Sequence, residues 1–341
     1  KLTTPFFEMA GLDNYYLLRT INVMNKAFLT ATLLVISHVP TRAQEVPKAK
    51  ISNGTISAEI YLPDAVNGYY RGARFDWSGV VSQLNYKGHS YFGQWFEKYD
   101  PFLHDAITGP VEAFDPLGYD QAKVGQTFVK VGIGVLERLD TAPYHFAKPY
   151  KIVDHGIWSI KHSADKVEFV HDLVSEDYSY SYKKVVRISG NKMIIDHTLT
   201  NKGGQVIDTQ VFDHNFFVID NDTVGPGFHI RFPFEVEGDA GGLGDFAVVS
   251  GGEIRYTGVL GKNDHARLRS IGGYGGSASD YDIAIENRNT GAGVRITCDR
   301  PLSRLIFWSA MKTVCPEPYI SVKVAASESF SWTITYDYYT L

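Results

Sequence analysis

The sequence predicts an all-β protein, and within that class a large antiparallel β-sandwich, for three reasons. From residue 51 almost to the C-terminus, short runs alternate between apolar and polar residues, which is the period of a half-buried strand. Compact turn sequences separate these runs, among them Ser189-Gly190-Asn191 and Lys202-Gly203-Gly204. No pattern of a long amphipathic helix occurs after residue 43.

The predicted strands follow one another closely along the chain. Residues 51–62 alternate and are broken by Asn53-Gly54. The other strand-like runs are 167–173, 178–188, 192–201, 205–219, 281–286, 293–298, 304–308, 319–324 and 329–338. The stretch 99–126 is the least regular and is rich in Asp, Pro, Gly and His, so we expect a long loop near a site rather than core.

The mature chain is predicted to be a single domain, residues 44–341. No Pro- or Ser-rich linker divides it, and no repeat of about 20 to 50 residues stands out.

The N-terminal part predicts export. Met24-Asn25-Lys26 begins a basic start, residues 27–36 are an apolar run, and Thr41-Arg42-Ala43 ends in small residues. Together these features are typical of a secretory signal peptide at 24–43, cleaved after Ala43. The run is shorter than the roughly 20 residues of a membrane span, so no span is expected in the mature chain. A buried helix of the mature fold is the alternative, and residues 1–23 are interpreted as a non-native or upstream extension. We therefore expect a periplasmic or secreted protein.

Composition narrows the class of partner. The net charge is −5 and no long basic run occurs, which argues against nucleic acid and anionic membrane surfaces. Aromatic residues make up 13% of the chain, a supply that suits strands and also suits stacking against sugar rings. The two cysteines, Cys298 and Cys315, are too few for a disulfide scaffold and match no zinc spacing, so either one bridge or two buried thiols fit. Neither a metal nor another cofactor is expected.

Several familiar catalytic motifs are missing from the sequence. It contains no G-x-S-x-G elbow, no H-E-x-x-H zinc helix and no P-loop. What remains is acid/base chemistry by histidine and carboxylates.

The first candidate for that chemistry is His214, in Asp213-His214-Asn215-Phe216-Phe217. On the predicted strand, Phe212, His214 and Phe216 share one face, while Ile207 and Val211 indicate another apolar face. Such a strand fits a pocket wall, and it also fits a plain sandwich core with a hydrogen-bonded structural histidine.

The second candidate is Glu317, in Cys315-Pro316-Glu317-Pro318. Each proline fixes its own φ and biases the residue before it towards extended backbone, so this carboxylate is held stiffly. A surface turn is the alternative.

A third segment, Tyr70-Arg71-Gly72-Ala73-Arg74-Phe75-Asp76-Trp77, combines two arginines, a carboxylate and aromatic rings. Guanidinium groups bind vicinal oxygens and aromatic faces accept sugar C–H groups, which makes Arg71, Arg74 and Asp76 candidates for substrate binding. Solvated surface charges are the alternative. Weaker candidates for substrate binding are His104, Glu112, Lys130, Asp282 and Arg304.

In their order along the chain, these segments resemble the aldose 1-epimerase (galactose mutarotase-like) superfamily. Leu199-Thr200-Asn201 resembles the family's Asn-ended turn, the segment at His214 its catalytic histidine segment, and the segment at Glu317 a C-x-E-P variant of its catalytic glutamate segment. The resemblance covers residues 51–338. It departs from the family in lacking the N-H-L-H-G-G-like segment, for which His104 is a loose substitute. The chain is therefore identified as a divergent branch.

The resemblance implies the interconversion of sugar anomers by acid/base catalysis. Glu317 would be the base at the C1 hydroxyl and His214 the acid at the ring oxygen, while Arg71 and Arg74 would orient hydroxyls or a carboxylate of the sugar. The aspartate that typical members use to hold the sugar would be Asp280 or Asp282. Two alternatives remain, namely a sandwich that binds carbohydrate without turnover and a polysaccharide lyase or other glycoside-processing enzyme with the same fold.

Overall fold

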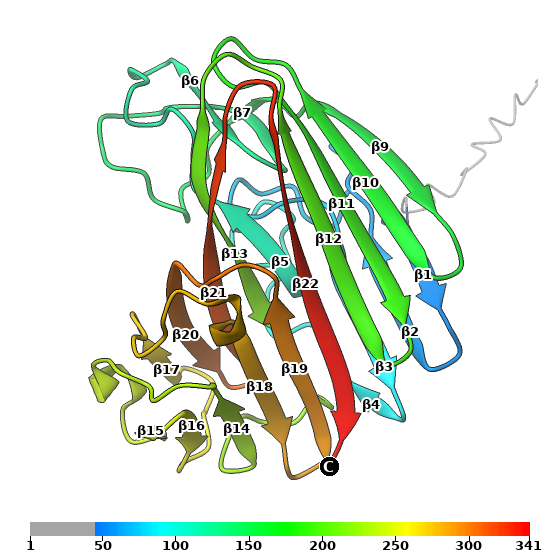
Figure 1. Ribbon diagram of the computed structural model, residues 1–341, viewed down its shortest axis with the longest axis vertical. Helices are drawn as coiled ribbons and strands as arrows, with labels where there is room; N and C mark the ends of the chain where they lie inside the picture. The colour runs from blue at the N-terminus through cyan, green and yellow to red at the C-terminus, as the bar shows by residue number, and fades with distance from the viewer. Residues whose placement is uncertain (1–44) are drawn as a thin grey trace, which may run out of the picture. The chain divides into compact units, whose positions relative to one another are not determined.

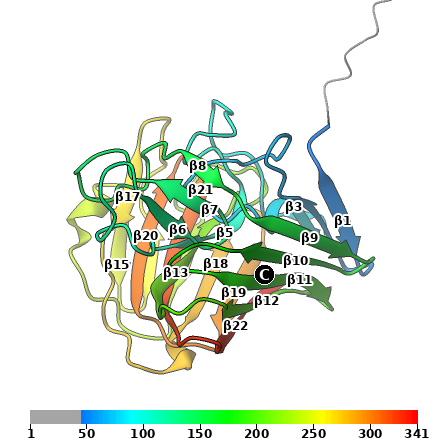
Figure 2. The same ribbon diagram turned by 90° about the horizontal axis from the view of Figure 1, so that it is seen from above.

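Two antiparallel sheets that pack face to face dominate the computed structural model, which describes residues 45–341 (Figures 1 and 2). The larger sheet has ten strands, in the order β15 (Ala247–Ser250), β16 (Glu253–Tyr256), β14 (Phe228–Arg231), β18 (Asp282–Asn287), β19 (Ala292–Cys298), β22 (Ser329–Thr340), β12 (Lys192–Asn201), β11 (Tyr180–Ser189), β10 (Lys166–Leu173) and β9 (Ile157–His162). The smaller sheet has five, in the order β17 (His265–Leu268), β20 (Arg304–Ala310), β21 (Thr313–Val324), β13 (Ile207–Phe216) and β5 (Gly109–Phe114). The prediction of an all-β antiparallel sandwich is confirmed.

Two smaller sheets and two short helices complete the described chain. One sheet holds β1 (Lys48–Ser52), β2 (Ile56–Tyr61), β3 (Val80–Tyr86) and β4 (His89–Ser90), and the other holds β6 (Thr127–Lys130), β7 (Gly134–Glu137) and β8 (Ile152–Asp154). The 3₁₀ helices are η1 (Ala240–Leu243) and η2 (Ala278–Asp280). The predicted signal peptide at 24–43 and the extension at 1–23 lie outside the described residues.

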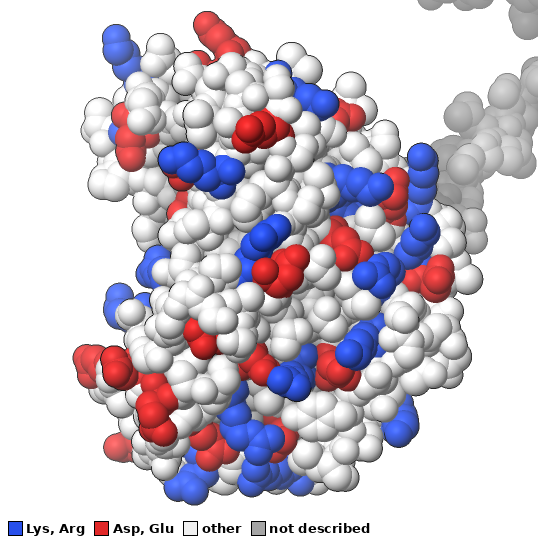
Figure 3. All heavy atoms as spheres, viewed as in Figure 1, with Lys and Arg blue, Asp and Glu red and all other residues white. Residues whose placement is uncertain are grey.

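The core lies between the two large sheets because their strands alternate buried and exposed side chains. In β12 and β22, every second residue is buried over most of the strand. Trp332 of β22 meets Phe114 of β5 edge-on, with ring centroids 6.2 Å apart. The outer face of the large sheet is polar, and Figure 3 shows lysines and arginines interspersed with aspartates and glutamates over it. Exposed pairs such as Arg187–Asp196 and Lys192–Asp337 account for part of this mixing.

The structure corrects two expectations about strands. The predicted strand 319–324 is only the second half of β21, which begins at Thr313 and runs through both prolines. The stretch 99–126, predicted as loop, contains β5, and all six of its residues are buried. β5 begins at Gly109, whose φ of 77° places it where a Cβ would come within 2.4 Å of the carbonyl oxygen of Val81.

Both cysteines are buried and unpaired, Cys298 on β19 and Cys315 on β21. Of the two possibilities left open by the sequence, the structure therefore has two buried thiols and not a disulfide bridge. Over residues 45–341, the helices are all too short or too polar to cross a membrane.

Candidate active site

β13 and β21 bring the two principal sequence candidates together. The Nε2 atom of His214, on β13, lies 3.5 Å from the Oε1 atom of Glu317, on β21. Both side chains are nearly buried, with 4% and 7% of the residue surface exposed. The two residues are about 100 positions apart in the chain, so their meeting depends on the sandwich topology.

The prolines on either side of Glu317 explain why the two strands have room for this pair. The register between β13 and β21 ends at Phe212–Tyr319 and resumes only at the bridge between Phe217 and Val314. Pro316 and Pro318 have no N–H to donate, so the ladder cannot continue between these points. The side chain of Asn215 takes its place.

Asn215 connects three strands through its amide. Its Nδ2 donates to the carbonyl oxygen of Pro316 at 3.0 Å, and its Oδ1 accepts from Tyr336 Oη of β22 at 2.9 Å. The side chain is completely buried, so these bonds are shielded from water. The segment at Glu317 is therefore the middle of a buried strand and not the surface turn that was the alternative.

The outer face of the five-stranded sheet carries the site. Strand alternation places Phe212, His214 and Phe216 of β13 on the same face as Glu317 and Tyr319 of β21 and Ile306 and Trp308 of β20. These side chains line a cavity of about 700 Å³. The other lining residues discussed below are Arg74, Trp95, Asp105, Asp115, Lys130, Tyr144, Phe146, His265, Arg267, Arg269 and Arg304.

Aromatic rings hold the imidazole of His214 in place. It stacks on Phe216 with ring centroids 3.8 Å apart and an angle of 6° between planes, and Trp95 stacks on the same phenylalanine at 5.0 Å. Trp308 and Phe75 meet the imidazole edge-on. Within the described residues, Nδ1 of His214 has no hydrogen-bond partner, so the packing of the aromatic rings fixes the imidazole on this side.

Burial sets the charges of the pair. It holds the pKa of His214 well below its usual range, and the nearby cation Arg74 acts in the same direction. Burial also raises the pKa of Glu317 to about 7, against the opposing field of Arg74. Below about pH 7 the pair therefore carries one proton, located on the carboxyl group. Titratable pairs of this kind are suited to acid/base catalysis near neutral pH.

A linked set of charges, His104, Asp105 and Arg74, forms one wall. Arg74 pairs with Asp105, whose other oxygen lies 3.0 Å from Nε2 of His104. Burial acts to raise the pKa of Asp105, but the hydrogen bond from His104 and the charge of Arg74 outweigh it and lower that pKa. Arg74 also lies over the ring of Phe146 at 4.1 Å. Of this set, Arg74 and Asp105 reach the cavity, and His104 stands behind Asp105.

Lys130 lies in the same wall and is almost completely buried. Its Nζ donates to the carbonyl oxygen of Arg74 at 2.7 Å and to Tyr144 Oη at 2.9 Å. Burial, reinforced by the charge of Arg74, lowers the pKa of Lys130 to about 7.

Besides His104, four of the predicted binding residues do not line the cavity. Arg71 donates to the carbonyl oxygen of Val66 at 2.7 Å and lies over Phe102. Asp282 lies on β18 of the other sheet, where it pairs with Arg295.

The other two, Asp76 and Glu112, point into the sandwich core. Both pair with the buried Lys184 of β11, and Glu112 Oε1 also lies 2.7 Å from His197 Nε2 of β12. Glu112 faces inward because its neighbours Val111 and Ala113 face the opposite way on β5. The expectation that these two carboxylates contact a substrate is corrected: Glu112 joins the two large sheets through Lys184, and Asp76 pairs with the same lysine from the segment before β3.

Several lining residues were not singled out from the sequence. They are Trp95, Asp105, Asp115, Tyr144, Phe146, His265, Arg267, Arg269, Trp308 and Tyr319. The alternation of 265, 267 and 269 and of 304, 306 and 308 was a usable signal, because both sets share the parity of one strand face. Trp95, Asp105 and Tyr144 come from irregular segments, and no periodicity could have indicated them. Within residues 45–341, no group of three or more His, Cys, Asp or Glu side chains is arranged to hold a metal ion.

Proteins of known structure share this fold. No protein-family model matches the sequence, and a search among curated proteins finds no match. Solved structures do match. A galactose mutarotase-like protein from Lactobacillus casei is 12% identical over 86% of this chain and 100% of its own, with a TM-score of 0.52. One from Clostridium acetobutylicum is 15% identical over 86% and 95%, also with a TM-score of 0.52. An aldose epimerase homologue from C. elegans is 13% identical over 87% and 100%, with a TM-score of 0.50. The chain thus has the galactose mutarotase-like fold, in a divergent form, as the sequence predicted.

Proposed function

We propose that the protein is a carbohydrate-active isomerase that interconverts sugar anomers in the manner of aldose 1-epimerases. The observation that carries the proposal is the 3.5 Å approach of His214 Nε2 and Glu317 Oε1 at the wall of a cavity of about 700 Å³. A cavity of this size suits a small molecule, and the rings of Trp308 and Tyr319 supply flat apolar faces for sugar C–H groups.

The chemistry requires two proton transfers for each ring opening. A base removes the proton from the C1 hydroxyl and an acid protonates the ring oxygen; the ring opens, the C1–C2 bond turns and the ring closes from the other face. Glu317 is placed at the C1 hydroxyl and His214 at the ring oxygen. Opening then begins with the carboxylate and the imidazolium and leaves the carboxylic acid beside the neutral imidazole. Closure uses these groups in reverse, so the pair needs a single shared proton throughout.

Burial supports this scheme at one stage in particular. It raises the pKa of Glu317 and lowers that of His214, and so favours the carboxylic acid beside the neutral imidazole. This is the protonation form required while the sugar is open. Interactions of the ring form with the pair must then move the proton to His214, and the neighbouring Asp105 acts in that direction because it raises the pKa of the imidazole.

The cavity offers less support for a lyase. A lyase needs a tyrosine or histidine base beside a cation, and Tyr144 beside Lys130 is the arrangement in the cavity that most resembles this. Burial raises the pKa of Tyr144, with the neighbouring Tyr150 acting in the same direction, so the phenolate is disfavoured. Export through the segment 24–43 remains part of the proposal and would place the activity in the periplasm or outside the cell.

The proposal is tested by the relaxation of freshly dissolved α-sugars, followed by polarimetry or NMR over a panel of sugars. Loss of either proton-transfer group is expected to slow the catalysed relaxation by about 10²–10⁴-fold, in His214→Asn and in Glu317→Gln. Exposed residues of the same types provide matched controls, His162→Asn and Glu328→Gln. If the wild-type protein relaxes no sugar of the panel faster than buffer alone does, the isomerase proposal is contradicted. Sugars that then still raise the melting temperature of the protein would indicate binding without turnover.

The pH profile gives an independent readout. The pKa of Glu317 at about 7 predicts that kcat/KM falls above about pH 7, where the pair loses its only proton. A second decline is expected at low pH, below the lowered pKa of His214, where both groups are protonated. In Glu317→Gln the limb near pH 7 should disappear from the residual rate. A limb that stays in place would show that another group is responsible.

A further inference from the structure

A second cavity, of about 670 Å³, adjoins the one that holds His214 and Glu317. The two cavities share four lining residues, His265, Arg267, Arg269 and Trp308. Shared walls make them two parts of one groove. Each part alone falls within the roughly 300–1,000 Å³ of a small-molecule site, so the groove can accept more than one sugar unit.

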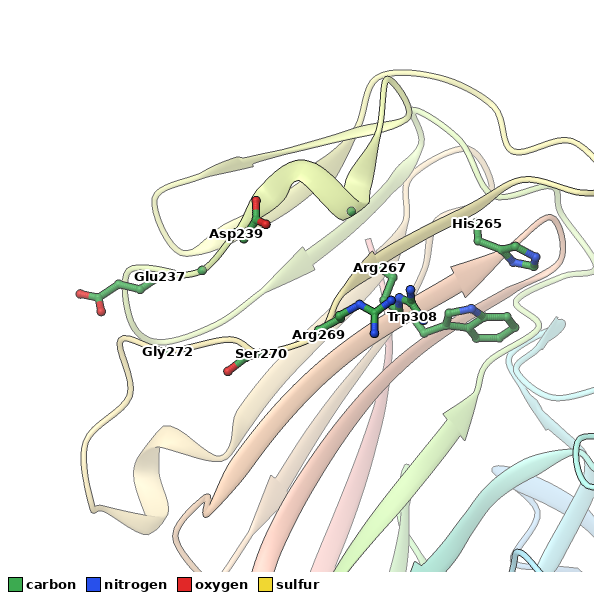
Figure 4. A pocket seen from close by; sticks show the side chains of 10 residues that line it. Glu237, Asp239, His265, Arg267, Arg269, Ser270, Gly272 and Trp308 are labelled. Carbon is green, nitrogen blue, oxygen red and sulfur yellow. The ribbon is translucent and has the colours of Figure 1, made fainter. Parts of the chain in front are cut away.

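The shared wall is built by the edge of the five-stranded sheet. β17 pairs with β20 in a register that places Arg267 opposite Trp308. Strand alternation buries Ala266 and Leu268 and exposes His265 and Arg267, and Arg269 follows with the same parity. Figure 4 shows the guanidinium groups of Arg267 and Arg269 on the side of the indole of Trp308. All three side chains line both cavities, so they lie at their junction.

The arginines at this junction form no close ion pair with a carboxylate within the part of the chain that the structure describes. Arg187, Arg231 and Arg295 each pair with a carboxylate, whereas the ion pairs within residues 45–341 include none for Arg267, Arg269 or Arg304. Neither acidic residue of the second cavity pairs with these arginines.

Asp239 and Glu237 are those acidic residues. Asp239 caps η1 by accepting from the amide of Gly241 at 2.9 Å. The side chain of Glu237 points away from the arginines in Figure 4. The groove therefore presents guanidinium groups without carboxylate partners, beside an aromatic face, between two spaces that each fit a small molecule.

We infer that the second cavity is a binding subsite for an anionic sugar unit, so that the substrate is an acidic oligosaccharide and not a neutral free hexose. Its carboxylate or sulfate group lies against Arg267 and Arg269, and the neighbouring unit that is isomerised lies at His214 and Glu317. Guanidinium forks bind both anions through paired N–H bonds. Trp308 provides a stacking face between the two units. This inference rests on the proposed function for the reaction, but the binding it describes does not require turnover.

The test compares ligands of equal length and different charge. Trigalacturonate, its fully methyl-esterified form and a sulfated galactose trimer are titrated into the protein by calorimetry at low and at moderate salt. Trigalacturonate or the sulfated trimer is expected to bind at least about tenfold more tightly than the neutral ester, with a preference that weakens as salt rises. The ligand that binds better identifies the anion. Equal affinity for all three would overturn the subsite.

Variants test whether Arg267 and Arg269 cause the preference for acidic trimers. The double variant Arg267→Gln/Arg269→Gln should bind the acidic and the neutral trimers equally, while Arg255→Gln, an exposed arginine on β16 of the other sheet, should retain the preference. Circular dichroism and thermal denaturation check that each variant is folded. A preference that survives in the folded double variant would overturn the assignment.

The two proposals fail in different ways. Glu317→Gln should keep the preference for the acidic trimer although it loses turnover. A wild type that prefers the acidic trimer but isomerises none of the sugars would remove the proposed reaction and leave the subsite in place. A wild type that isomerises sugars but shows no preference for the acidic trimers would remove the anionic subsite and leave the proposed reaction in place.

Discussion

The two faces of β13 carry ionisable groups with different partners: a network that contains a lysine on the inner face, and a carboxyl group and aromatic rings on the outer face. On the inner face, Asp213 points towards a network in which Lys184 of β11 pairs with Glu112 and Asp76. On the outer face, one residue further along, His214 meets only Glu317 and a set of aromatic rings. Both faces are buried, so the difference lies in the partners and not in exposure to water.

The comparison shows how burial can serve stability on one face and reactivity on the other. In the inner network, Lys184 supplies a positive charge that keeps Glu112 ionised: burial acts to raise the pKa of this carboxyl group, but Lys184 and His197 outweigh it and lower the pKa. On the outer face, Glu317 has no ion pair with a lysine or arginine among the described residues, and burial raises its pKa to about 7. A buried carboxylate with a cation is structural, and one beside a neutral imidazole is ready to exchange a proton.

Removal of the inner cation should have the largest effect on stability. Lys184→Met removes the lysine cation from the two buried carboxylates, leaving Glu112 with His197 and Asp76 with Ser78, and is expected to destabilise the fold by about 3–5 kcal/mol. The free energy of unfolding, from denaturant titration, provides the measurement. The double variant Lys184→Met/Glu112→Gln should lose less than the sum of the single variants, because the charges are removed together. Additive losses would show that Lys184 and Glu112 are not coupled, and the comparison would fail.

A neutral residue in place of Glu317 should change the free energy of unfolding in the opposite direction, towards higher stability. The pKa of this group rises on folding from 4.5 to about 7, so its contribution to stability is complete below pH 4.5 and is lost as the pH rises through 7. Glu317→Gln should therefore stabilise the fold at pH 8, by about 1–3 kcal/mol, and by only a few tenths at pH 4.5. Thermal and denaturant unfolding at the two pH values would measure this, with Glu328→Gln as the exposed control. A loss of stability at pH 8 would mean that the carboxylate is paired in the folded protein.

The smallest effect is expected for Asp282. It lies on the outer face of the large sheet in an exposed pair with Arg295, so Asp282→Asn should change the free energy of unfolding by less than about 1 kcal/mol. Relaxation of α-sugars should be unchanged, since the residue is not in the wall of either cavity. A tenfold fall in the rate of sugar relaxation in Asp282→Asn would show that the ten-stranded sheet also contributes to the site, which the comparison of the two faces of β13 does not predict.

Much of the fold followed from the sequence because alternation is a local property. The runs at 192–201 and 329–338 predicted β12 and β22 almost to the residue. The failures have local causes as well. Pro316 and Pro318 obscured the first half of β21, since prolines normally argue against an inner strand. β5 lies in a stretch rich in Asp, Pro and Gly and is buried on both faces, so it has no alternation to detect.

The site was predictable only in part. His214 and Glu317 stood out because of the segments that hold them, and three of the residues proposed to bind substrate, Arg74, Lys130 and Arg304, line the same cavity. Glu112 could not be excluded from sequence, because which face of β5 points outward depends on the pairing with β13. Asp76 lies in an irregular segment before β3, where no alternation indicates the direction of a side chain. Asp105 and Trp95 reach the cavity from loops, and only tertiary structure determines such positions.

Asn215 offers protein engineers a way to adjust the spacing of His214 and Glu317. Where the prolines interrupt the ladder, its amide links β13 to β21 through a bond of 3.0 Å to Pro316, and to β22 through a bond of 2.9 Å to Tyr336. Shorter or longer side chains at this one position would narrow or widen the gap while the strands on either side keep their register. A library at residue 215 could therefore tune the width of the cavity at His214 and Glu317 without a redesign of the sheet.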